Sequence, residues 1–250
     1  MTLPNGRPST LELSGSSGTS AHATSSPEAS SPSPSPTTSP GYSLERRIDL
    51  SEMYPEEWHP DIPRLMDHYF QNLGVDIPDL DGPMTTDLLR TRLFPLIMTD
   101  PAPLHAVMLV AASHHGRVRG SRLHAIDLLQ LRGMAISEIN AALEDPRRAT
   151  SDQLIVAVAM MACYEALFGD RDIFNTHMTG LTRMVTLRGG LPNLGLDGLL
   201  ERLILWIDAN ATLIVGRHVY FDKAAFPTSA VHPRPNPRKF AGGIVREGQS

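Results

Sequence analysis

An apolar run near the middle of the chain limits its possible folds more than any other feature. Residues 154–168 read LIVAVAMMACYEALF, with one charge, Glu165, and neither glycine nor proline. The run is shorter than the roughly 20 apolar residues that span a bilayer, so it predicts a buried core helix. A helix that is apolar on nearly every face must be covered by other helices. The run therefore predicts a multi-helix domain.

The residues on either side of this run predict where its helix begins and ends. Thr150 precedes Gln153 by three positions. This is the spacing of a capping box, in which each side chain bonds a backbone N–H near the helix start. Gly169 follows the run and is expected to end the helix.

Apolar residues spaced three or four apart predict further helices on both sides of the central run. Pro95 is expected to kink or interrupt one of them, and Gly180 to permit the close approach of a neighbouring helix. One predicted helix carries an apolar stripe that is expected to face one way, formed by Leu123, Ile126, Leu129, Ile136, Ile139 and Leu143. The predicted helices cover residues 62–74, 86–98, 99–116, 123–143, 172–187 and 199–214.

The expected fold class is all-α, a multi-helix bundle with antiparallel helical hairpins, because no polar–apolar alternation is long enough to predict a strand. Residues 1–55 are predicted to be a disordered tail, since Ser, Thr and Pro fill 20 of the 27 positions from 14 to 40. The five Ser-Pro steps there leave two interpretations open, proline-directed phosphorylation and a plain spacer. Residues 56–225 form the predicted helical domain, and 226–250 a Pro-rich tail.

Charge and cysteine content exclude several classes of protein. The net charge is −5 and the basic residues are scattered, so the chain is not expected to bind nucleic acid directly. The single cysteine, Cys163, can form neither an intramolecular disulfide nor a multi-cysteine metal site. No secretory signal or membrane-spanning run is visible, which predicts a soluble intracellular protein without membrane contact.

A search for chemical sites leads us to assign no catalytic, cofactor-binding or metal-binding residue, and no cofactor. His114 and His115 are adjacent, so on a helix they point about 100° apart and are not expected to hold one ion together. No H-E-x-x-H, C-x-x-C, G-x-S-x-G or P-loop pattern occurs. The charged residues Glu165, Asp170 and Asp172 are expected to cap helices and form surface ion pairs at a turn.

Three stretches of the sequence nevertheless resemble a known family. They read LLRTRLFPLIMTDPAPLHAVMLVAASHHGRVRG, ATSDQLIVAVAMMACYEALFGDRDIFNTHMTGLTRMVTLRGG and LGLDGLLERLILWIDAN. In this order they resemble the regulatory (middle homology) domain of fungal zinc-cluster transcription factors, second subfamily. The resemblance implies an all-helical domain of a nuclear regulator of RNA polymerase II transcription, of which 56–225 is expected to be the front portion. A zinc cluster needs six thiolates, so none of these residues is expected to form one.

We therefore expect a noncatalytic, transcription-regulator-like domain in the nucleus. It is expected to act through protein partners or a homodimer, with a small-molecule effector as a further option. The alternative is a small-molecule-binding or protein-interaction module with no role in transcription, its pocket among the methionine-rich helices near Met160, Met161, Met178 and Met184. An enzyme is a third hypothesis that no residue pattern supports.

Overall fold

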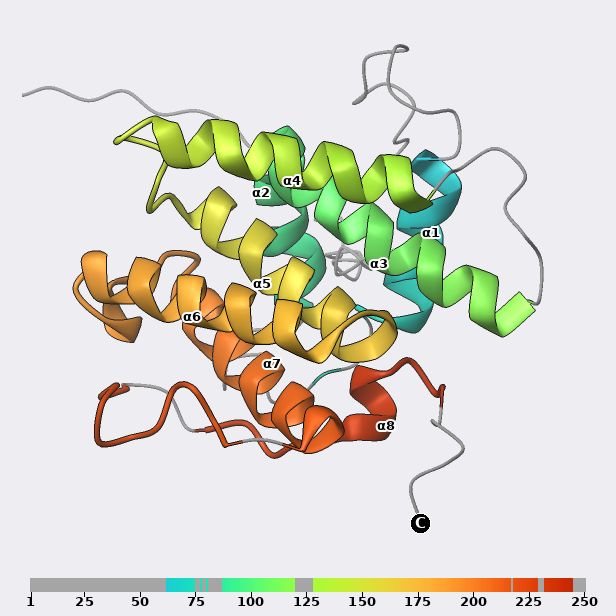
Figure 1. Ribbon diagram of the computed structural model, residues 1–250. Helices are drawn as coiled ribbons and strands as arrows, with labels where there is room; N and C mark the ends of the chain where they lie inside the picture. The colour runs from blue at the N-terminus through green and yellow to red at the C-terminus, as the bar shows by residue number, and fades with distance from the viewer. Residues whose placement is uncertain are drawn as a thin grey trace, which may run out of the picture. The chain divides into compact units, whose positions relative to one another are not determined.

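The computed structural model describes residues 62–74, 77, 80, 87–119, 128–216, 218–228 and 232–244. These residues contain helices and turns and no strand, which confirms the predicted all-α bundle (Figure 1). The predicted tail 1–55 lies outside them. The elements are α1 (Ile62–Asn72), the π-helical turn η2 (Leu89–Leu93), α2 (Phe94–Ile97), α3 (Pro101–Arg119), α4 (Leu128–Glu144), α5 (Asp152–Phe168), α6 (Arg171–Leu187), the 3-10 turn η3 (Leu191–Asn193), α7 (Leu199–Val215) and α8 (Pro237–Phe240).

Helix α5 is the centre of the fold, as the apolar run predicts. It packs against α3, α6 and α7, and α4 lies beside it (Figure 1). All but four of its seventeen residues are buried. The connection to α6 is two residues long, so α5 and α6 form an antiparallel hairpin.

The start of α5 differs from the prediction, whereas its end agrees. The N-cap is Ser151, whose Oγ accepts a hydrogen bond from the Leu154 N–H at 3.2 Å. Gln153 instead donates to Thr99 Oγ1, so the predicted capping box is wrong. Gly169 ends the helix as predicted. Ser151 can cap because its backbone is extended, which aims its hydroxyl along the helix axis.

Helix α3 packs against α5, α1 packs against α3, and α2 contacts both α3 and α5. Pro95 lies where the π-helical turn η2 passes directly into α2, so the predicted helix changes its hydrogen-bonding pattern beside this proline, which has no backbone N–H to donate. The Asp100 carboxylate accepts a hydrogen bond from the Ala102 N–H at the start of α3. Among the described residues no single helix is long and apolar enough to cross a membrane. The pair 89–97 and 101–119, bent by 119°, reaches that length and composition together.

Helix α4 faces the core with a different stripe from the predicted one. Its buried residues are Leu131, Ala135, Ile139 and Ala142, which pack toward α3. Leu129, Ile136 and Leu143 are exposed, so the predicted stripe does not face one way. Its first two members, at 123 and 126, lie outside the described residues. Small residues at 135 and 142 let α4 lie close to α3, which explains why alanines rather than leucines face inward.

The prediction for Gly180 is also wrong. This residue is exposed on α6, and a Cβ built on it would meet nothing within 4 Å. No neighbouring helix therefore requires a glycine there. Helix α7 lies below α5 and ends at Gly216, whose φ of +75° is the left-handed conformation of a glycine C-cap.

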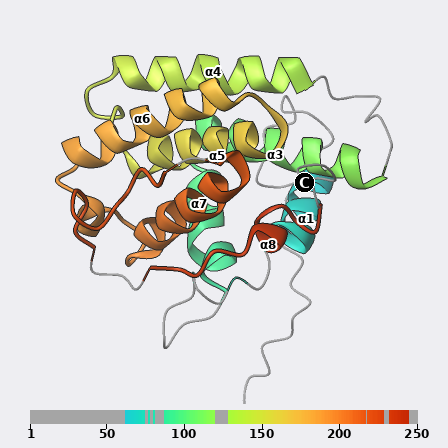
Figure 2. The same ribbon diagram turned by 60° about the horizontal axis from the view of Figure 1, so that its bottom comes forward.

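The chain after α7 packs back onto the domain. We call the described residues 218–228 and 232–244 the C-terminal strap. It runs along α7 and ends with α8 close to α1 (Figure 2). Phe221 and Phe240 of the strap are buried, and the Phe240 ring packs against Trp206 of α7. Part of the Pro-rich segment 226–250 thus contributes to the core.

Candidate functional site

Asp208 of α7 fixes the beginning of the strap. Its carboxylate is buried and accepts hydrogen bonds from the backbone N–H groups of Tyr220 at 2.9 and 3.0 Å and of Phe221 at 2.8 Å. Burial raises the pKa of Asp208, while these N–H donors favour its ionised form and oppose the shift. The backbone at 220–221 is therefore held against α7 by one carboxylate.

Two more polar side chains of α7 hold the rest of the strap. Thr228 Oγ1 donates to the buried Glu201 carboxylate, and the Asn236 N–H donates to Asn210 Oδ1 at 2.6 Å. Buried polar groups are stable only when they are hydrogen-bonded. The strap thus satisfies acceptors that would otherwise be buried in an apolar helix.

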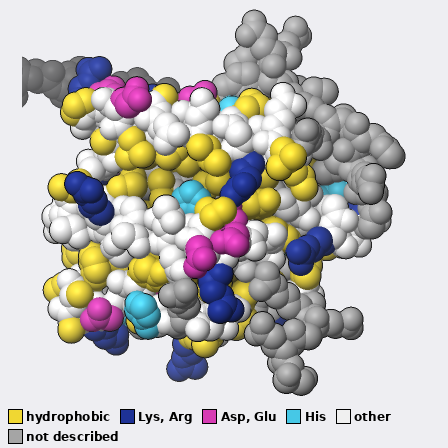
Figure 3. Space-filling view, viewed as in Figure 1, with side chains coloured by type: hydrophobic (Ala, Val, Ile, Leu, Met, Phe, Trp, Pro, Cys, Tyr) yellow, Lys and Arg dark blue, Asp and Glu magenta, His cyan; other side chains and the backbone are white. Residues whose placement is uncertain are grey.

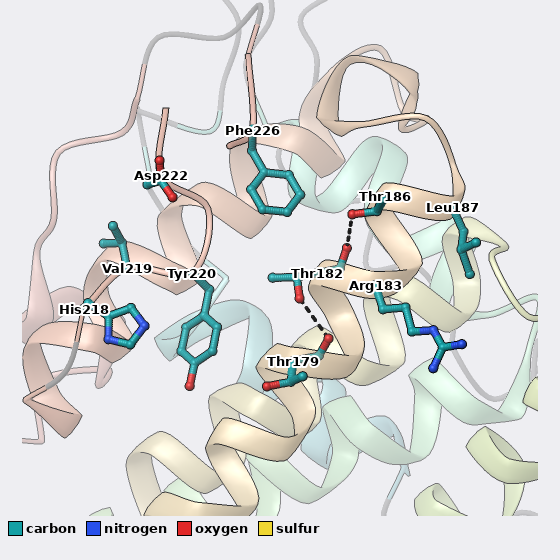
Figure 4. A pocket seen from close by; sticks show the side chains of 10 residues that line it. All are labelled: Thr179, Thr182, Arg183, Thr186, Leu187, His218, Val219, Tyr220, Asp222 and Phe226. Atoms are coloured by element: carbon teal, nitrogen blue, oxygen red, sulfur yellow. Dashed lines mark hydrogen bonds between the residues drawn. The ribbon is translucent and has the colours of Figure 1, made fainter. Parts of the chain in front are cut away.

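A pocket with a volume of about 490 Å³ lies between α6 and the first residues of the strap. This size is within the ordinary range of small-molecule sites. Figure 4 shows the rings of Tyr220 and Phe226 facing Thr182 across the opening, whereas Arg183 and Leu187 extend away from them. The lining residues are Thr179, Thr182, Arg183, Thr186, Leu187, His218, Val219, Tyr220, Asp222 and Phe226.

Tyr220 and Phe226 form the aromatic wall of this pocket, and neighbouring residues hold both rings in position. The Tyr220 hydroxyl donates to Asn175 Oδ1 at 2.6 Å, and its ring meets Phe174 edge-on at 6.0 Å. His218 stacks on the other side of Tyr220 with a centroid distance of 5.5 Å. The Phe226 ring packs against the buried Phe221. The wall is thus positioned by α6 and by the Asp208 anchor rather than by the strap alone.

The methionines that the sequence suggested for a pocket lie elsewhere. Met160, Met161, Met178 and Met184 are all buried, and none of them lines this pocket. They fill the core between α5 and its neighbours. A ligand site among these methionines stays a prediction, separate from this pocket. The signal that was missed is Asp208, an acidic residue inside the otherwise apolar helix 199–214, because such a residue needs a polar partner.

The prediction for the charged residues at the α5–α6 turn, which we call the charged corner, is partly correct. Asp170 caps α6, and its Oδ1 accepts hydrogen bonds from the N–H groups at 172 and 173. Glu165, however, is buried rather than on the surface. Its Oε1 accepts from Arg132 Nε and Nη2 at 3.1 and 2.7 Å, and its Oε2 from the Asp170 N–H at 2.8 Å. This corner therefore joins α4 to the hairpin.

Two of the histidines form a hydrogen-bonded chain that ends on the strap. His114 Nε2 lies 3.1 Å from the Gly242 carbonyl oxygen, which can only accept, so Nε2 carries the hydrogen. His114 Nδ1 then accepts from His68 Nε2 at 2.8 Å, and His68 Nδ1 accepts from Asn72 at 3.2 Å. Both imidazoles are therefore neutral. Burial, followed by the nearby His114, His115 and Arg119, lowers the pKa of His68 to about 4.

Comparison with known proteins gives one match. The sequence profile described as "Fungal specific transcription factor domain" matches residues 64–236. The match covers the helices from α1 to α7 and the strap up to Asn236. No curated protein and no solved structure matches the chain. Because the profile covers more than half of the sequence and agrees with the observed helical domain, the chain belongs to the family of fungal specific transcription factor domains.

Proposed function

We propose that this chain is a noncatalytic regulatory domain that acts in the nucleus on transcription by RNA polymerase II. The observation that carries the proposal is the family match over residues 64–236. The domain acts by contact with other proteins, including a second copy of the chain, or with a small-molecule effector. DNA contact is assigned to none of these residues, because one cysteine cannot supply the thiolates of a zinc cluster.

The structure favours an effector as one route of regulation. The pocket between α6 and the strap is large enough for a small molecule and combines aromatic rings with a few polar groups, the usual make-up of such sites. The strap is held to α7 by Asp208, so occupation of the pocket changes the stability of this attachment. The alternative function is a binding module with no role in transcription. Such a module would use the same pocket but would not change transcription in the cell.

A reporter assay tests the proposal. The full chain is fused to an unrelated DNA-binding domain and its effect on an RNA polymerase II promoter is measured in fungal nuclei. We expect reporter output to differ from that of the DNA-binding domain alone. The matched control is Val158→Asp, which places a charge in the core and is expected to abolish the effect. A folded fusion that reaches the nucleus and leaves the reporter unchanged would contradict the proposal.

A further inference from the structure

We propose that the pocket between α6 and the strap binds a small organic amine in its cationic form. The inference rests on the proposed function, since it specifies the chemical class of the effector. It follows from the hydrogen-bonding state of the lining residues, from the charge on the pocket rim and from the aromatic faces that line it.

The threonines of α6 present acceptors to the pocket. The Thr182 hydroxyl donates to the Thr179 carbonyl oxygen, and the Thr186 hydroxyl donates to the Thr182 carbonyl oxygen, both at 2.8 Å (Figure 4). Each hydroxyl has one hydrogen, so both oxygens are left with lone pairs only. A ligand at this wall must therefore bring its own donors.

Asp222 adds a full negative charge to the rim. Its Oδ1 accepts hydrogen bonds from the N–H groups of Ala224 and Ala225 at 2.9 and 3.1 Å. Its Oδ2 makes no hydrogen bond within the described part of the chain, so it is open to a ligand. The one lining cation, Arg183, extends away from the aromatic wall, and Lys223 does not line the pocket.

The aromatic wall favours the same class of ligand. The Tyr220 hydroxyl donates to Asn175, and the rings of Tyr220 and Phe226 line the pocket. The faces of Tyr220 and Phe226 attract a cation through their quadrupoles and also accommodate an apolar body. An ammonium group with an apolar chain satisfies the threonine oxygens, Asp222 and these rings together. A carboxylate in the same place would be repelled by Asp222.

Three ligands with one apolar body test the inference on the purified full chain. 2-Phenylethylamine, 2-phenylethanol and 3-phenylpropionate differ only in the polar end, and their affinities are measured by titration with NMR detection. We expect the amine to bind several-fold more tightly than the alcohol and the carboxylate not to bind. If the carboxylate binds at least as tightly as the amine, or if no ligand gives a saturable response, the inference is wrong.

Variants locate the binding on the proposed residues. Asp222→Asn keeps the acceptor for the two N–H groups and removes the charge, so we expect amine affinity to fall about 3-fold, as for an exposed ion pair. The matched control is Asp145→Asn, which removes a partly exposed charge that also caps a turn but does not line the pocket. Thr182→Val removes one acceptor and is expected to weaken amine binding while alcohol binding changes less. Equal amine affinity in all variants would place the ligand elsewhere.

The binding result and the reporter result are independent of each other. A chain that regulates the reporter but binds no amine retains the proposed function and overturns the inference. A chain that binds the amine through Asp222 but has no effect on the reporter supports the inference as a property of the pocket. That outcome contradicts a role in transcription.

Discussion

The ion pair between Arg132 and Glu165 predicts a large loss of stability when only the arginine is removed. The Glu165 carboxylate is 1% exposed, and two of its three hydrogen bonds come from the Arg132 guanidinium. Arg132→Met keeps most of the apolar stem but leaves the buried carboxylate with one donor, the Asp170 N–H. Breaking a buried pair from one side costs about 3–5 kcal/mol.

We expect the lower end of this range, about 3 kcal/mol, because one donor remains and Arg132 is itself 28% exposed. In a domain of this size that corresponds to a fall in Tm of about 6–12 °C. Glu165→Gln removes the charge and lets Arg132 be hydrated, so its cost is expected to be about 1–2 kcal/mol. The double variant is expected to be more stable than Arg132→Met alone, since no buried charge is left.

The assay is denaturant unfolding of the purified full chain, followed by circular dichroism, for the two single variants and the double variant. The control is Arg147→Met, which breaks a pair whose arginine is 92% exposed and is expected to cost less than about 1 kcal/mol. A cost below about 1 kcal/mol for Arg132→Met would refute the argument. Additive costs in the double variant would do so too, because they would show that the two side chains are not coupled.

Three further predictions follow from the same packing. The pKa of His68 is about 4 in the folded chain and 6.5 when unfolded, so the unfolded state binds more protons between these pH values. Tm is therefore expected to fall as the pH decreases from 6.5 toward 4. In a series of thermal melts, His68→Gln is expected to make Tm depend less on pH. Val158→Asp buries an unpaired charge and should unfold the domain, whereas Leu129→Asp, at a site 75% exposed, should leave the circular-dichroism melt nearly unchanged. Gly242→Ala should destabilise the chain more than Gly243→Ala in chemical unfolding: both have positive φ, but only at Gly242 would a Cβ clash with the His114 imidazole.

The central part of the fold could be predicted from the sequence because its signals are local. The run 154–168 contains nearly every residue that α5 buries, and Gly169 and Gly216 end their helices as glycines commonly do. These features depend on side-chain polarity and backbone conformation within one helix. Neither requires knowledge of which helix lies next to it.

The orientation of α4 could not be predicted in the same way, because α4 carries apolar residues on two faces. Spacing alone does not decide between a stripe of leucines and a stripe that includes Ala135 and Ala142. The choice depends on the distance to α3, which small residues shorten. The exposed position of Gly180 has a similar explanation, since glycine permits a close approach without causing one.

The candidate site depends on contacts between residues far apart in the sequence. Asp208 in α7 binds the Tyr220 N–H, the Tyr220 hydroxyl donates to Asn175 in α6, and the pocket opens between α6 and the strap. The sequence could have indicated Asp208, as an acid in an apolar helix, but not the backbone N–H groups that bond to it.

The same contacts connect the pocket to the core through the strap. A ligand that binds only when the strap is in place stabilises the attached strap by RT ln(1 + [L]/Kd). Near the end of the strap, the Gly242 carbonyl oxygen accepts a hydrogen bond from His114 Nε2, which links the strap to α3. Ligand binding at one end of the strap and the His114 hydrogen bond near its other end therefore both favour the attached strap.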